Sequence, residues 1–109
     1  MSLDFGLQFE GEDTKETCEL YERNITHNVA NMWGRAGIFN SLYNSGGKKA
    51  KEELENLREG LKKMEDSPAE YRKLDPENGW GDYDSALEFL REVVSYCAKY
   101  PNSIIWVSK

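Results

Sequence analysis

The chain is poor in the residues that build metal centres and disulfide frameworks. It has one histidine and two cysteines among 109 residues. Cys18 and Cys97 form no Cys-x-x-Cys pair, and a single histidine offers no second imidazole at helical spacing. We therefore expect no metal site, no cofactor and no disulfide scaffold, and we interpret both cysteines as small buried hydrophobic residues.

Long apolar runs and an excess of positive charge are also missing. No stretch approaches the roughly 20 apolar residues of a membrane span, and the N-terminus lacks a signal-peptide layout, so we expect a cytoplasmic protein without membrane contact. Lys and Arg number 14 against 20 Asp and Glu, a net charge of −6, which makes nucleic acid an unlikely partner. We interpret the small basic cluster at 48–51 as a solvated helix start rather than a phosphate site.

What the chain does have is enough apolar material for one core. The hydrophobic share is 39%, with three Trp, six Tyr and four Phe. A chain of this length buries most of its apolar surface in one domain, and no linker interrupts it. We expect a single domain over residues 1–109.

Three segments carry strand signals. Leu3, Phe5 and Leu7 alternate with polar or glycine positions, which predicts a strand over 3–10. A polar turn and a second stretch of β-type composition predict a hairpin partner over 17–25. The segment 103–108 is apolar at nearly every position, so we expect a last strand that is central in the sheet or covered on both faces.

Helical spacing begins after the hairpin. A first helix is predicted from Thr26 or His27, with Thr26 as N-cap, to Ala36, with Gly37 as a left-handed cap. Residues 40–47 are typical of a loop. The strongest helix follows over 50–64, where apolar residues recur in steps of four and three.

Two further helices are predicted in the second half. Ser67 and Pro68 start a short helix that carries Tyr71 and Leu74. A capping box of Ser85 and Glu88 opens the last helix, which ends before Tyr100.

Together these elements predict an α+β fold in the order β-β-α-α-α-β. A small three-stranded sheet, the N-terminal hairpin plus the C-terminal strand, carries three to four helices, mainly on one face. The opposite face of the last strand then needs a helix or a partner chain to cover its apolar side chains.

The first candidate site is the string Asn24-Ile25-Thr26-His27-Asn28, which lies at a strand-to-helix junction. A helix N-terminus has free N–H groups, and such a junction can hold a polar ligand. Thr and Asn are also ordinary capping residues, which we consider the commoner role. The candidate ligand contacts are Asn24, Thr26, His27 and Asn28.

The second candidate is Asn78-Gly79-Trp80-Gly81-Asp82-Tyr83, which adds Trp80 and Tyr83. Flanking glycines let the indole lie against the domain edge, the interpretation we favour, or over a planar ligand. The acidic neighbours Glu77, Asp82 and Asp84 favour a purine-like or cationic small ligand over nucleic acid.

The two strings, together with Ala36-Gly37-Ile38 and Tyr100-Pro101 before Val107-Ser108, resemble short uncharacterised proteins of bacteriophages and prophages. The likeness covers residues 17–109. It implies a phage or mobile-element setting and no mechanism. This chain departs from the family by a shorter, glycine-rich connection at 44–47.

Three functions remain open, and none of them assigns a catalytic residue. The first is a non-enzymatic accessory protein that binds a small polar ligand or a host protein. The second is a small hydrolase or transferase with His27 as general base and Thr26 or a cysteine as nucleophile. The third is a structural homodimer joined through the apolar stripe at 50–64, so the protein is either a monomer or a homodimer.

Overall fold

The computed structural model describes residues 2–8 and 19–109. These residues form a three-stranded antiparallel sheet of β1 (Ser2–Gln8), β2 (Glu19–Thr26) and β3 (Ile104–Ser108), in the spatial order β2-β1-β3. A 3-10 turn, η1 (His27–Val29), leads into five helices: α1 (Ala30–Ala36), α2 (Phe39–Tyr43), α3 (Ala50–Asp66), α4 (Pro68–Arg72) and α5 (Tyr83–Lys99). The predicted α+β class and the order of elements are confirmed.

The alternation in β1 sorts its side chains onto two faces. Leu3, Phe5 and Leu7 are buried, and Leu7 lies between Tyr21 on β2 and Ile105 on β3 in the sheet register. Of the two alternatives left open for the C-terminal strand, the central position is excluded, because β1 is the middle strand and β3 lies at an edge. The predicted strand ends at 9–10 and 17–18 lie outside the described residues.

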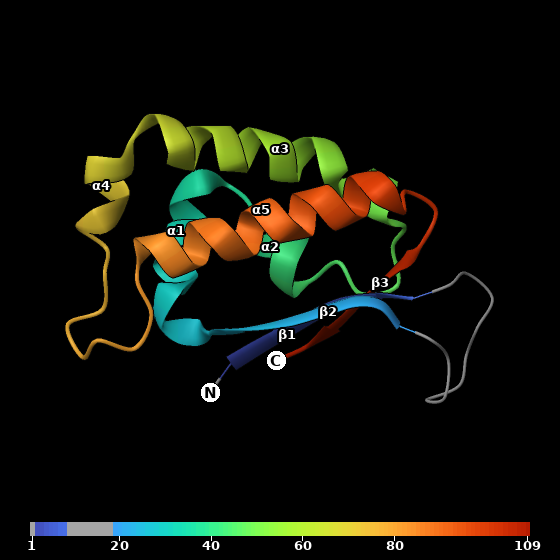
Figure 1. The fold of residues 1–109 in the computed structure, drawn as a ribbon, viewed down its shortest axis with the longest axis horizontal. Coiled ribbons are helices and arrows are strands. Elements are labelled where there is room, and N and C mark those ends of the chain that lie inside the picture. The colour runs from blue at the N-terminus through green and yellow to red at the C-terminus, as the bar shows by residue number, and fades with distance from the viewer. Residues whose placement is uncertain (1, 9–18) are drawn as a thin grey trace.

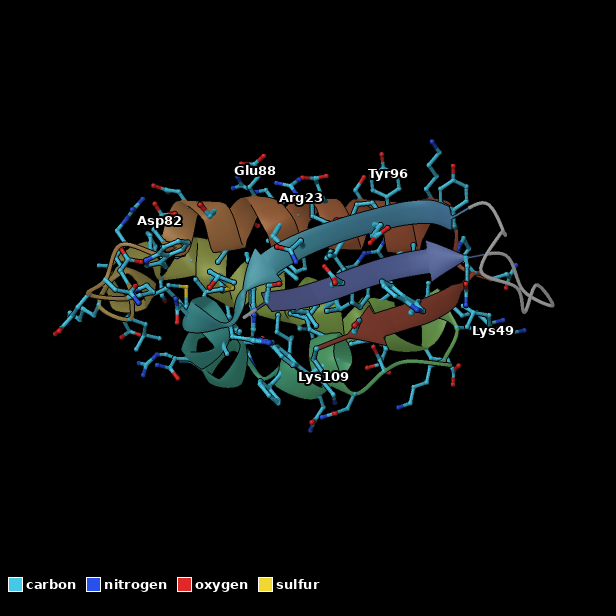
Figure 2. All side chains as sticks on the ribbon, turned by 90° about the horizontal axis from the view of Figure 1, so that it is seen from below. Arg23, Lys49, Asp82, Glu88, Tyr96 and Lys109 are labelled. Carbon is cyan, nitrogen blue, oxygen red and sulfur yellow. The ribbon has the colours of Figure 1, made fainter. Side chains whose placement is uncertain are left out.

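All five helices lie on one side of the sheet (Figure 1). The view from below shows the other face, with α5 running behind β2 (Figure 2). Arg23 on β2 forms ion pairs with Glu88 and Glu92 of α5, and the Tyr21 and Tyr96 rings stack with centroids 4.3 Å apart. These contacts fasten the edge strand β2 onto the helical layer.

The apolar stripe of α3 packs into the core of its own chain. Ala50, Leu57 and Met64 are buried, and Leu54 and Leu61 pack against the same core. The stripe is therefore explained within one chain and does not support the homodimer hypothesis.

The predicted caps of the first helical segment are correct. Thr26 Oγ1 accepts a hydrogen bond from Asn28 N at 3.2 Å, and Gly37 ends α1 with φ +78°. The capping box predicted for the last helix is wrong. α5 begins at Tyr83, because the Asp82 carboxylate accepts a hydrogen bond from Ser85 N at 2.8 Å, and this bond lowers the pKa of Asp82.

The predicted loop at 40–47 contains a helix, α2. Leu42 and Tyr43 of α2 are buried, and Ser45 Oγ, just beyond it, donates to Ser41 O. Tertiary packing therefore forms a helix where propensity is weak. α4 ends at Arg72, so Leu74 follows this helix rather than belonging to it.

The remaining sequence expectations concern isolated positions. Cys97 is buried, as predicted, whereas Cys18 lies outside the described residues. The basic cluster lies at the start of α3, where Lys49 N donates to Glu52 Oε2 at 2.8 Å. Within residues 2–8 and 19–109, every helix is too short or too polar to cross a bilayer.

Candidate functional site

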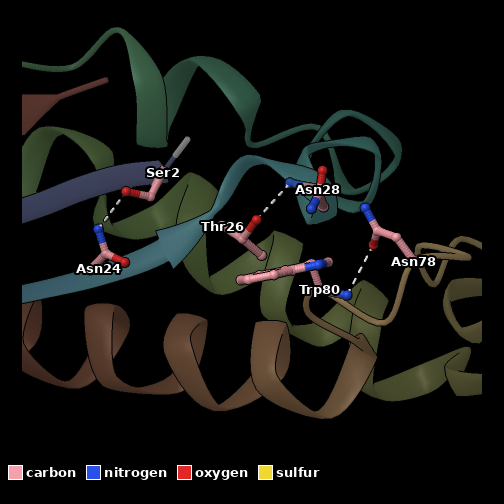
Figure 3. Close-up of a pocket in the computed structure, with 6 residues that line it drawn as sticks. All are labelled: Ser2, Asn24, Thr26, Asn28, Asn78 and Trp80. Carbon is pink, nitrogen blue, oxygen red and sulfur yellow. Dashed lines mark hydrogen bonds between the residues drawn. The ribbon is translucent and has the colours of Figure 1, made fainter.

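The two polar strings of the sequence meet in one open pocket of about 480 Å³ (Figure 3). It lies where the end of β2 meets η1 and the loop that precedes α5. Four of the six predicted site residues line it, and the structure adds two more: the full lining is Ser2, Asn24, Thr26, Asn28, Asn78 and Trp80. We call this cavity the asparagine pocket.

The sheet positions one wall of the asparagine pocket. Ser2 pairs with Thr26 in the register of β1 and β2, and Asn24 lies two residues before Thr26 on the same face. The Asn24 amide donates to Ser2 Oγ at 2.8 Å and to Asp4 Oδ1 at 2.6 Å. Both amide hydrogens of Asn24 are thus used, and its carbonyl oxygen is left to accept.

The loop before α5 supplies the opposite wall. Asn78 Oδ1 accepts a hydrogen bond from Trp80 N at 2.9 Å, which shapes the turn. Gly81 has φ +92°, and a Cβ there would lie 2.6 Å from Thr26 Cγ2 and 3.0 Å from Val29 Cγ1. Only glycine lets the backbone approach the strand-to-helix junction this closely, so Gly81 brings Trp80 to the pocket.

Trp80 does not seal the edge of the core, and the interpretation that we favoured from the sequence is wrong. Its side chain is 70% exposed. The core at this end is filled instead by Tyr83, which is 3% exposed and donates from Oη to Met64 O at 2.6 Å. Tyr83 is therefore a structural residue, and the indole of Trp80 is available to a ligand.

His27, another predicted ligand contact, does not line the pocket either. Its half-buried ring turns toward α2, where Nδ1 lies 2.8 Å from the hydroxyl of Tyr43. Burial raises the pKa of Tyr43, so this hydroxyl stays protonated at neutral pH. The bond ties η1 to α2, a structural role for His27.

The described cysteine is a poor nucleophile. Cys97 is fully buried on α5, and burial raises the pKa of its thiol to about 12. A thiol of that pKa is almost wholly protonated at neutral pH. Neither Cys97 nor Tyr83 lines the asparagine pocket.

The chemistry of the asparagine pocket is polar and uncharged. None of its six lining residues is ionisable in the physiological range. Two of the three acidic residues that favoured a cationic ligand have other roles, because Asp82 caps α5 and Asp84 pairs with Arg72 at 2.9 Å.

Several polar atoms of this lining have no hydrogen-bond partner among the described residues: Asn24 Oδ1, Asn78 Nδ2 and the side-chain amide of Asn28. The Ser2 hydroxyl accepts from Asn24 and keeps its own hydrogen to donate. The pocket thus offers both donors and acceptors to a ligand.

A second open cavity, of about 440 Å³, lies between α1 and the α3–α4 corner and has a different character. It is lined by charged side chains, and two of them, Arg35 and Glu70, pair with each other at 3.0 Å. Its polar groups are partly satisfied within the chain, which makes it the weaker candidate for a ligand.

Sequence reasoning missed Ser2 and Asn78. Asn78 belongs to the second candidate string, and the turn brings it into the same pocket as Asn28 (Figure 3). Ser2 enters through the strand register, because it lies directly opposite Thr26. The predicted hairpin is the sequence signal that could have identified Ser2, because it pairs the first strand with the strand that leads into the first candidate string.

Comparisons with known proteins add no assignment. No family model, no curated protein and no solved structure matches the chain significantly. In the described part of the chain, no three histidine, cysteine, aspartate or glutamate side chains gather as metal ligands do. Fold and site thus define an α+β domain with a neutral, amide-lined surface pocket beside an exposed indole.

Proposed function

We propose that the protein is a non-enzymatic binding protein that holds a small, polar, uncharged ligand in the asparagine pocket. The observation that supports this proposal is the convergence of two distant segments on one cavity whose amides have unused hydrogen-bonding atoms. The phage or prophage setting rests on the sequence resemblance and belongs to the same proposal.

The ligand's chemistry is argued from the lining. Since no lysine or arginine lines the pocket and the chain carries a net charge of −6, phosphates and other anions are disfavoured. Amides both donate and accept, so they suit ligands with hydroxyl or amide groups. The exposed Trp80 face adds an apolar surface for stacking. A small molecule fits this cavity better than a host protein does.

The test is a thermal-shift and fluorescence screen with glucose, N-acetylglucosamine and adenosine, which are all uncharged at neutral pH. A ligand present at 100 times its dissociation constant adds about 2.7 kcal/mol to the free energy of unfolding. We expect at least one of these ligands to raise the melting temperature and to change the emission of exposed Trp80.

Matched glycine variants locate the site. Gly81→Ala forces a Cβ into Thr26 and Val29 and displaces Trp80, so binding should be lost. Gly79→Ala meets nothing within 4 Å and carries only the strain of its φ of +76°, so most of the binding should remain. Equal binding by wild type and Gly81→Ala, or no shift with any ligand, would overturn the proposal.

A further inference from the structure

The asparagine pocket opens onto the helix-free face of the sheet, and this face carries further polar side chains. Ser2, Asp4 and Gly6 alternate with the buried residues of β1 and so share the face opposite the helices. Asp4 pairs in register with Asn24 on one side and with Ser108 on the other. A row of polar side chains therefore leads away from the pocket across all three strands.

A second tryptophan lies further along this face. Trp106 of β3 pairs with Gly6, and a Cβ on Gly6 would lie 3.3 Å from Trp106 Cε3, so the indole packs over the glycine on the helix-free side. Trp106 remains partly exposed. The Gly6 rung is four residues from the Ser2 rung, a separation of about 14 Å along the strand.

The pocket and the face together thus have an accessible indole at each end and hydrogen-bonding side chains between the two indoles. Indole faces bind the C–H surface of sugar rings, while amides and carboxylates bind sugar hydroxyls. A single small ring would use only the Trp80 end. A linear ligand with repeating units would use both.

We propose that the asparagine pocket is one end of a track, from Trp80 to Trp106, that binds a linear neutral oligosaccharide. This inference rests on the proposed function and names its ligand class. A nucleoside is the competing ligand for the pocket alone, but its single base has no use for Trp106. Acidic sugars are disfavoured, because Asp4 lies in the middle of the track and the net charge is −6.

The test is calorimetric titration with cello-oligosaccharides and chito-oligosaccharides of increasing length, from the monosaccharide to the pentasaccharide. We expect the pentasaccharide of at least one series to bind about tenfold more tightly than its monosaccharide, since a second stacking contact contributes at that scale. An oligogalacturonide of equal length, which carries a carboxylate on each ring, should bind more weakly.

Two variants separate the ends of the track. Trp106→Leu keeps an apolar side chain on Gly6 but removes the indole, so the gain with length should disappear while monosaccharide binding remains. Trp80→Ala, at a largely exposed position, should abolish both. In the wild type, amide NMR signals of Gly6 and Ser108 should shift with the pentasaccharide and stay in place with the monosaccharide, a readout that needs no variant.

The outcomes distinguish this inference from the proposed function. If the pentasaccharide binds no better than the monosaccharide, the track is wrong and the pocket stands. If adenosine binds at Trp80 and no sugar does, the ligand class is wrong and the pocket again stands. If no ligand of either kind perturbs Trp80, both proposals fall.

Discussion

The two faces of the sheet differ in what they contribute, although the same strands build both. On the helix-covered face, Leu3, Phe5 and Leu7 are at most 1% exposed. On the other face, Ser2 and Asp4 are partly exposed and form hydrogen bonds with Asn24. Alternate residues of β1 therefore have different roles: one set packs in the core, and the other set contributes to the candidate site.

This arrangement explains how a small sheet can carry a site without weakening its core. In a strand, successive side chains point to opposite faces, so polar groups on one face displace no apolar contacts on the other. Substitutions at neighbouring positions should consequently have very different effects. The following predictions test how sharp that separation is.

The largest difference is expected between Phe5 and Ser2. Phe5→Ala deletes a fully buried ring and should cost about 3–5 kcal/mol in the free energy of unfolding. Ser2→Ala should change it by less than about 0.5 kcal/mol, because Asn24 keeps its bond to Asp4. Urea denaturation of both variants measures the contrast, and similar losses would mean that the two faces are not separated as described.

An intermediate effect is expected where the helices of the covered side pack most closely. Gly60 of α3 is buried, and an added Cβ would overlap Ile38 Cγ2. Gly60→Ala should therefore destabilise the fold by about 1–3 kcal/mol despite the better helix propensity of alanine. Gly34 of α1 is exposed with nothing within 4 Å, so Gly34→Ala should stabilise by about 0.5–1 kcal/mol. Thermal melts that move in the same direction would contradict this reading.

The parts of the fold that the sequence predicted are those with a strong local pattern. Alternation in β1, the stripe of α3 and the Thr26 and Gly37 caps all express local geometry, and each is present in the structure. α2 was missed because its residues have weak helix propensity and form a helix through packing of Leu42 and Tyr43. The edge position of β3 could not be predicted, because strand order depends on pairing between distant segments.

The candidate site was predicted in composition but not in geometry. The two strings that stood out do meet, and they supply Asn24, Thr26, Asn28 and Trp80. The sequence could not predict which way these side chains point. His27 turns to Tyr43, and Tyr83 turns into the core. Short-range patterns locate a junction, whereas the tertiary fold decides which of its side chains face the solvent.

The smallest effect is expected at the Tyr21 hydroxyl, which β2 places on the covered face of the sheet. The Tyr21 hydroxyl is buried and has no hydrogen-bond partner among the described residues. Tyr21→Phe removes this unsatisfied group and should stabilise the fold by about 0.5–1 kcal/mol. Tyr83→Phe is the matched control, because it removes the bond from Oη to Met64 O and should destabilise by about 1 kcal/mol.

The pH dependence gives the same variant a second readout. Burial raises the pKa of Tyr21 above the ordinary value of about 10, so the folded state holds this proton more tightly than the unfolded state does. The associated stability is fully present below the unfolded pKa and is lost as the pH rises from there toward the folded pKa. Unfolding free energies measured across this alkaline range should fall less steeply for Tyr21→Phe than for the wild type. Tyr21→Phe could instead destabilise the fold at neutral pH, as Tyr83→Phe does. That result would contradict the prediction, because it would mean that the Tyr21 hydroxyl has a hydrogen-bond partner.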